Sequence, residues 1–329
     1  METMAPQKMR IIAIEEHYAT LDFIKTANIQ MRDQYKRARG PGATLTERLC
    51  DLGDLRVQEM DAAGIDMQVL SLTSPGVQQM AAADAVAIAR EQNDILAQAV
   101  KYYAERFAGF AALPTQDPDQ AARELERTVN DYGFKGAAVM GHTQGRYLDE
   151  EFFRPILESA AALQVPIYLH PTRPPQKVIE AYYTGAYAPN ISGLLSTAAW
   201  GWHIETAVHS LRLVAGGVFD RFPGLRIIIG HLGETIPFLL STINRYLPRE
   251  ETYLERPVES YFRENFYYTL SGLNNLPAFL GLLLQVEVDR ILFSADYPYE
   301  SMESACRFLD QLPVNPADKE RIAHGNAER

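Results

Sequence analysis

Four side chains of this sequence are of the types that bind divalent metals, and each stands at the end of an apolar run. They are Glu15, His17, His170 and Asp296. Two imidazole nitrogens and two carboxylate oxygens suit Zn²⁺ or Mn²⁺ better than Ca²⁺ or Mg²⁺. The sequence therefore predicts one divalent metal ion per chain, Zn²⁺ or Mn²⁺, bound by these four residues.

The spacing of Glu15 and His17 supports a shared site. Side chains alternate between the two faces of a strand, so these two lie on one face and Glu16 lies on the other. A single histidine at a strand end is more often a hydrogen-bonded structural residue than a ligand. Three such histidines, His17, His170 and His231, together with Asp296, favour a common site.

The remaining histidines differ in context. His231 would stand beside the metal without necessarily binding it, and His142 follows the fourth apolar run, where it would line the pocket. His203 and His209 fall in a helical pattern, and His324 falls in a terminal helix and is expected at the surface.

Eight short apolar runs, rich in β-branched and aromatic residues, alternate with segments of helical periodicity. The predicted strands are residues 10–17, 66–73, 107–114, 134–141, 166–171, 225–233, 265–272 and 290–298. The predicted helices are residues 81–106, 119–131, 151–164, 204–219, 235–246 and 275–286. Eight such units in one chain predict an α/β fold, a (β/α)₈ TIM barrel forming a single domain over residues 1–329. A doubly wound sheet would need a glycine-rich turn after the first strand, which ends in Glu-Glu-His instead.

Two connections after strands are longer than ordinary βα loops. They run from residue 18 to about 45 and from residue 172 to about 192. Loops that follow strands lie on the C-terminal face of a barrel, where active sites are built. We therefore expect both to be functional, the first through the basic run 36–39 and the second through its tyrosines.

Composition excludes several classes of function. A net charge of −11 without a basic cluster argues against nucleic acid and anionic membranes as partners. No apolar stretch is long enough to span a membrane. Two cysteines cannot form a disulfide framework and the N-terminus lacks a signal region, so we expect a cytoplasmic protein. The chain has neither a P-loop nor a dinucleotide fingerprint, and no organic cofactor is expected.

The ordered set of short motifs resembles the amidohydrolase superfamily. It consists of Glu-x-His, His-Pro, Gly-His-x-Gly-Glu and Ser-x-Asp-x-Pro after the first, fifth, sixth and eighth strands. The set is most similar to the branch of metal-dependent, non-oxidative aromatic acid decarboxylases, such as gamma-resorcylate, 2,3-dihydroxybenzoate and 5-carboxyvanillate decarboxylases. Residues 48–51, 59–65, 111–114 and 205–209 extend the resemblance over nearly the whole chain. Hydrolytic members commonly begin with His-x-His and often carry a carbamylated lysine after strand four, whereas here Glu15 comes first and Lys135 begins that strand.

The resemblance implies the activity. It is a carboxy-lyase reaction, the reversible decarboxylation of an ortho-hydroxy aromatic acid of the hydroxybenzoate type, with CO₂ or bicarbonate as the other partner. The metal would chelate the carboxylate and the phenolic oxygen. Asp296 resembles the family's proton donor, and His231, oriented by Glu234, would assist it. The resemblance also implies a homodimer or homotetramer, and a native chain that continues a few residues beyond Arg329.

Six residues are expected to contact the substrate: Met140, His142, Trp202, Thr242, Tyr297 and Tyr299. Resorcylate-type members have an asparagine where Met140 stands and an arginine about where Thr242 stands, and both are thought to hold the aromatic acid. Their loss predicts weak activity on gamma-resorcylate and a preference for a less polar or bulkier acid. Arg146, or the basic run 36–39, would then supply the missing cation.

Two other functions use the same residues. In a mononuclear hydrolase of a lactone or amide, the metal would generate hydroxide and Asp296 would act as general base. In a binding or scaffold protein, the metal would affect melting but no substrate would be turned over. Glu15 as first ligand and the missing lysine favour decarboxylation.

Overall fold

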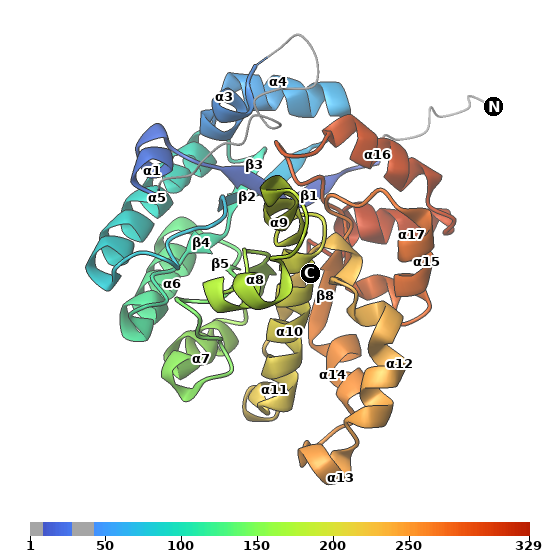
Figure 1. The fold of residues 1–329 in the computed structure, drawn as a ribbon. Coiled ribbons are helices and arrows are strands. Elements are labelled where there is room, and N and C mark those ends of the chain that lie inside the picture. The colour runs from blue at the N-terminus through green and yellow to red at the C-terminus, as the bar shows by residue number, and fades with distance from the viewer. Residues whose placement is uncertain (1–8, 28–42) are drawn as a thin grey trace, which may run out of the picture.

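The computed structural model describes residues 9–27 and 43–329. Its strands lie at the centre of the molecule and helices surround them (Figure 1). The described strands are β1 (Ile12–Tyr18), β2 (Met67–Leu72), β3 (Phe107–Gly109), β4 (Ala111–Ala112), β5 (Ala137–Met140), β6 (Ile167–His170), β7 (Ile227–Ile229), β8 (Phe266–Thr269) and β9 (Ile291–Leu292). Each falls within one of the eight predicted runs except β1, which extends one residue beyond its run, and the third run is divided into β3 and β4.

All strand pairs are parallel, in the orders β1-β2-β3 and β4-β5-β6-β7-β8-β9. The two sheets meet at Phe110, whose backbone N–H donates to the Leu70 carbonyl at 2.9 Å. At the opposite edges, Ile14 N–H donates to the Phe293 carbonyl at 3.2 Å and His17 N–H donates to the Tyr297 carbonyl at 2.7 Å. These bonds connect the first unit to the last, and the predicted (β/α)₈ barrel is confirmed.

The helices follow the strands in order. Those of the first half are α1 (Leu21–Thr26), α3 (Leu45–Cys50), α4 (Asp54–Ala63), α5 (Ala82–Tyr102), α6 (Pro118–Tyr132) and α7 (Arg154–Ala162). Those of the second half are α8 (Gln176–Tyr182), α9 (Pro189–Leu195), α10 (Gly201–Ala215), α11 (Val218–Arg221), α12 (Ile236–Tyr246), α13 (Arg249–Thr252), α14 (Val258–Glu264), α15 (Leu276–Leu283), α16 (Met302–Gln311) and α17 (Pro316–Glu320). In the described part of the chain, none of them is long and apolar enough to cross a bilayer.

Two helical predictions need correction. The predicted helix 204–219 is two helices, because Gly217 adopts a left-handed conformation (φ 67°) between α10 and α11. The predicted long connection 172–192 contains α8 and the beginning of α9, and these two helices cross in front of the strands in Figure 1. The basic run 36–39 lies outside the described residues.

Two apolar layers hold the barrel together. An inner cluster fills the space enclosed by the strands and includes Ile12, Ile14, Phe110, Met140 and Tyr168. A larger cluster packs the outer faces of the strands against the surrounding helices. Burial on both faces explains why the strands are apolar runs without alternation.

Glu16 joins the first strand to the segment that follows the last. Its buried carboxylate accepts hydrogen bonds from the backbone N–H groups of Ala295 (2.8 Å) and Tyr297 (3.0 Å) and from the Ser294 hydroxyl (3.1 Å). These bonds fix both neighbours of Asp296. Glu16 therefore sets the position of the predicted catalytic carboxylate.

We expect Glu16→Ala to lower the free energy of unfolding by about 3 kcal/mol or more, because unpaired buried donors cost about 1–3 kcal/mol each. Chemical denaturation measures this change. Glu126→Ala, at an exposed position of α6, should stay within about 0.5 kcal/mol of wild type. Equal stabilities of the two variants would contradict the assigned role of Glu16.

Candidate metal centre and active site

A β-bulge in β1 turns Glu15 and His17 toward the barrel axis. Between Ala13 and Glu16 the register of β1 against β2 shifts by one residue. Ile14 belongs to the inner apolar cluster, so strict alternation would have turned Glu15 outward. The bulge re-aims the strand, which is a common use of bulges beside active sites.

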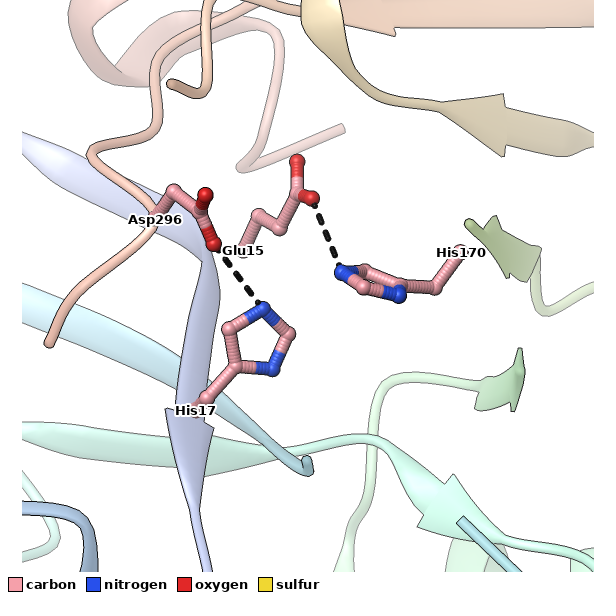
Figure 2. Close-up of side chains that lie close together, drawn as sticks. All are labelled: Glu15, His17, His170 and Asp296. Carbon is pink, nitrogen blue, oxygen red and sulfur yellow. Dashed lines mark ion pairs between the residues drawn. The ribbon is translucent and has the colours of Figure 1, made fainter. Parts of the chain in front are cut away.

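The four predicted ligands gather at the ends of three segments (Figure 2). Glu15 and His17 come from β1, His170 ends β6, and Asp296 follows β9. One ligand atom from each lies within 4.8 Å of those of the others. His17 Nε2 is 3.1 Å from Asp296 Oδ1, and His170 Nε2 is 3.4 Å from Glu15 Oε1. That these atoms bind a metal stays a prediction, but the structure brings them together.

One carboxylate oxygen of Glu15 accepts hydrogen bonds, and the other accepts none. Oε2 accepts from the hydroxyls of Tyr168 and Thr269, the latter at 2.9 Å. Oε1 is fully buried and has no hydrogen-bond partner. Burial raises the pKa of Glu15, but the imidazoles around it, His231 first, outweigh burial and lower that pKa below its usual value. An ionised, buried oxygen without a donor is what a cation site requires.

The imidazoles of the two histidines predicted as ligands are held through their Nδ1 atoms. His170 Nδ1 lies 2.8 Å from the Pro171 carbonyl, and His17 Nδ1 lies 3.3 Å from the Ser71 hydroxyl. Their Nε2 atoms point into the cluster, and His17 Nε2 is buried without a hydrogen bond. Burial lowers the pKa of His17 to about 4 and that of His170 to about 3, so both rings are neutral at pH 7. Neutral imidazoles oriented by such bonds suit a divalent metal.

Asp296 is held in an unusual backbone conformation with one oxygen on each side of the site. Its φ is 68°, a left-handed conformation that costs a non-glycine residue about 1 kcal/mol. Oδ1 faces His17. Oδ2 lies beside Gly272, as does His231 Nε2: a Cβ atom added at this glycine would be 3.3 Å from Oδ2 and 3.4 Å from Nε2. Burial, and then the charge of Glu15, raise the pKa of Asp296 well above its usual value. The raised pKa allows the group to hold a proton, and its Oδ2 and His231 Nε2 both lie beside Gly272.

His231 and Glu234 form the predicted pair. His231 Nδ1 lies 2.7 Å from Glu234 Oε1, and both side chains are buried. Burial lowers the pKa of His231, but the carboxylates of Glu234 and Glu15 outweigh burial and raise that pKa to about 10. The ring is thus an imidazolium at neutral pH and can donate a proton from Nε2.

A cavity of about 830 Å³ opens above these groups. His170, His231 and Asp296 line it, and three of the six predicted substrate residues do so too: His142, Trp202 and Tyr299. The helix α8 and the connection after β6 form another wall, which includes Arg173. The second long connection therefore does border the candidate site.

The other three predicted substrate residues do not line this cavity. Met140 packs inside the barrel in the inner apolar cluster. Tyr297 is buried, and its hydroxyl donates to Glu59 Oε2 at 2.6 Å. Thr242 is exposed on α12, outside the barrel. The position of Met140 and Thr242 in this chain therefore does not support the preference for a less polar or bulkier acid inferred from these two residues.

Of the cations predicted beside the substrate, Arg146 does not line this cavity, and the basic run 36–39 lies outside the described residues. Arg146 forms an ion pair with Glu150 at 2.8 Å and lies over the ring of Phe152. Arg173 is the arginine that lines the cavity in the part of the chain that the structure describes.

Comparison with known proteins is consistent with this geometry. The amidohydrolase family model matches residues 20–329. The chain belongs to the amidohydrolase family. The gamma-resorcylate decarboxylase of Polaromonas sp. is 39% identical over 328 residues, which cover 96% of this chain and 97% of that protein.

Two solved structures of this family superpose closely on the chain. One is a dihydroxybenzoic acid decarboxylase from Polaromonas sp. with bound manganese and the inhibitor 2-nitroresorcinol, with a TM-score of 0.87, 37% identity and coverage of 97% of this chain and 96% of that one. The other is a 5-carboxyvanillate decarboxylase from Novosphingobium aromaticivorans with manganese and 4-hydroxy-3-methoxy-5-nitrobenzoic acid, with a TM-score of 0.87, 34% identity and coverage of 98% and 96%. The relationship to decarboxylases of the amidohydrolase family predicted from the motifs is confirmed.

Proposed function

We propose that this chain is a metal-dependent decarboxylase of ortho-hydroxy aromatic acids. The observation that carries the proposal is the buried cluster of Glu15, His17, His170 and Asp296 beside a cavity, with a second acid–base pair next to Asp296. The printed descriptions of the relatives support the same class of reaction. A divalent metal bound by this cluster would supply Lewis acidity and a template for the substrate's carboxylate and ortho oxygen.

The chain's own residues would handle the proton. The carboxyl group of Asp296 transfers its proton to the ring carbon that bears the carboxylate. The bond between that carbon and the carboxylate then breaks, its electron pair returns to the ring, and CO₂ leaves. One proton is consumed per turnover. The imidazolium of His231 would replace it on Asp296, and His231 would regain its proton from solvent in the cavity that both side chains line. The raised pKa values of Asp296 and His231 support these roles at neutral pH.

His231→Ala should keep its metal and lose about 10²–10⁴ in kcat, the usual contribution of a positioned acid–base group. Steady-state kinetics combined with metal analysis checks both statements. If the variant emptied the site, His231 would be a ligand and the proposed division of roles would be wrong.

A pair of isomeric acids tests the substrate class. The metal-loaded chain should release CO₂ from ortho-hydroxybenzoates such as salicylate and 2,6-dihydroxybenzoate. The isomer 3,5-dihydroxybenzoate should be inert, because it has no hydroxyl beside its carboxylate. Equal rates for the two dihydroxybenzoates would overturn the proposed chelation, and lactone or amide hydrolysis without CO₂ release would favour a hydrolase.

Several finer properties belong to the same proposal. We expect Mn²⁺ or Zn²⁺ as the metal, without an organic cofactor, and manganese is present in the two related structures. A homodimer or homotetramer, a cytoplasmic location and carboxylation of a phenol by bicarbonate stay predictions.

A further inference from the structure

His203, on α10, contacts the same carboxylate as His231. Its Nδ1 lies 2.5 Å from Glu234 Oε2, while His231 Nδ1 lies 2.7 Å from Oε1. The two imidazole rings are 5.0 Å apart and nearly perpendicular, and both line the cavity. One buried carboxylate is thus shared between two histidines, one facing Asp296 and one coming from a helix outside the barrel.

The turn that carries Glu234 needs an external anchor. Left-handed φ values occur at His231 (50°), Leu232 (56°), Glu234 (53°) and Thr235 (73°). Such conformations cost non-glycine residues about 1 kcal/mol or more each, and they persist only where the surroundings hold them. The bond between Glu234 and His231 lies within this turn. The bond to His203 instead connects the turn to α10.

The ring of His203 is itself fixed on its other side. The Trp202 indole N–H points at His203 Nε2 from 3.2 Å. An indole only donates, so Nε2 accepts, and the proton of the neutral ring lies on Nδ1, directed at Glu234. The Ala198 carbonyl, 3.1 Å from the same Nε2, can accept from the ring when it is protonated. His203 therefore has a partner in either state and donates to Glu234 in both.

We propose that His203 is a positioning residue for the proton transfer. By donating to Oε2, it holds the Glu234 carboxylate in the orientation that binds His231 Nδ1, so that His231 Nε2 faces Asp296. This role rests on the proposed decarboxylase function. Its loss is expected to slow turnover without weakening substrate binding, since His203 acts through Glu234.

The isosteric pair His203→Asn and His203→Leu tests this role. The asparagine amide nitrogen takes the place of Nδ1 and can donate to Glu234, whereas leucine fills the same space and cannot. We expect His203→Leu to lower kcat about 10–100-fold, the range seen when groups that orient functional side chains are lost. KM should change less than about twofold, and His203→Asn should recover most of the loss. Metal content should equal that of wild type in both variants.

Proton NMR of ¹⁵N-histidine-labelled protein gives a readout that does not depend on turnover. Wild type should show two Nδ1–H signals from the imidazoles bound to Glu234, in addition to any from His324, whose Nδ1 lies 3.0 Å from Glu328 Oε2. His203→Leu should lose one of the two Glu234-bound signals and shift the other. The proposal is overturned if His203→Leu keeps wild-type kcat, if its KM rises while kcat is unchanged, or if asparagine recovers nothing. Failure of the proposed function is distinct, because wild-type protein would then release no CO₂ while the NMR signals persisted.

Discussion

Asp296→Asn should nearly abolish decarboxylation, with a loss of about 10⁴ in kcat, the upper end of the usual contribution of a positioned acid–base group. An amide cannot deliver a proton to the ring carbon, although its oxygen can still face the other predicted ligands. The backbone around residue 296 should be unchanged, because Glu16 holds its two neighbours and asparagine tolerates a left-handed conformation. CO₂ release by the metal-loaded variant is the measurement.

The control for this variant is Asp310→Asn, an identical change at an exposed position of α16, which should keep wild-type kcat. Metal content of both proteins must be measured, since Asp296 is also a predicted ligand. A metal-loaded Asp296→Asn protein that kept more than about a tenth of wild-type kcat would show that another group protonates the ring.

His170→Ala should lose both the metal and the activity. The variant removes one of the two neutral imidazoles, and with it one of the four predicted ligand atoms that lie within 4.8 Å of one another. Wild type is expected to contain about one divalent ion per chain after dialysis, the stoichiometry of a mononuclear site. Elemental analysis of both proteins checks this, and CO₂ release checks the activity.

His142→Ala is the matched control for metal binding. His142 lines the cavity, but its ring nitrogens contact the Gly145 N–H and the Arg173 carbonyl, so this variant should keep one metal. Metal retention in His170→Ala, or about two ions per wild-type chain, would contradict the assignment of the ligands.

The barrel and the gathering of the four predicted ligands could be predicted because they follow from local patterns. Continuous apolar runs indicate parallel strands buried on both faces. Polar groups at the ends of parallel strands meet on one face of the barrel whatever their separation in sequence. Glu15 and Asp296 therefore lie close together. The hydrogen bond from Tyr297 N–H to Glu16 that holds their segments together joins residues 281 positions apart in the sequence.

Other parts of the site depend on three-dimensional details that leave no local pattern. The bulge in β1 appears only in its register with β2. Tyr168 and His203 look like strand and helix residues in sequence, and their contacts with Glu15 and Glu234 arise from packing between distant segments. Strand alternation correctly placed Glu15 and His17 on the same face of the first strand. It gave no signal that Glu16, on the other face, would accept hydrogen bonds from the two neighbours of Asp296.

The residues chosen by analogy for substrate binding illustrate the same limit. Tyr297 directly follows the predicted ligand Asp296, yet its ring lies near Arg56 and its hydroxyl donates to Glu59. Thr242 belongs to the amphipathic α12, and whether such a residue faces the cavity depends on how the helix packs. His142, Trp202 and Tyr299 do line the cavity.

The most direct test of the account is CO₂ release from 2,6-dihydroxybenzoate and salicylate before and after metal removal. Wild-type protein should release one CO₂ per phenol formed, lose this activity on treatment with a chelator, and regain it when about one equivalent of Mn²⁺ or Zn²⁺ is added. Release at an undiminished rate by metal-free protein, or no release from any ortho-hydroxybenzoate by metal-loaded protein, would contradict the account.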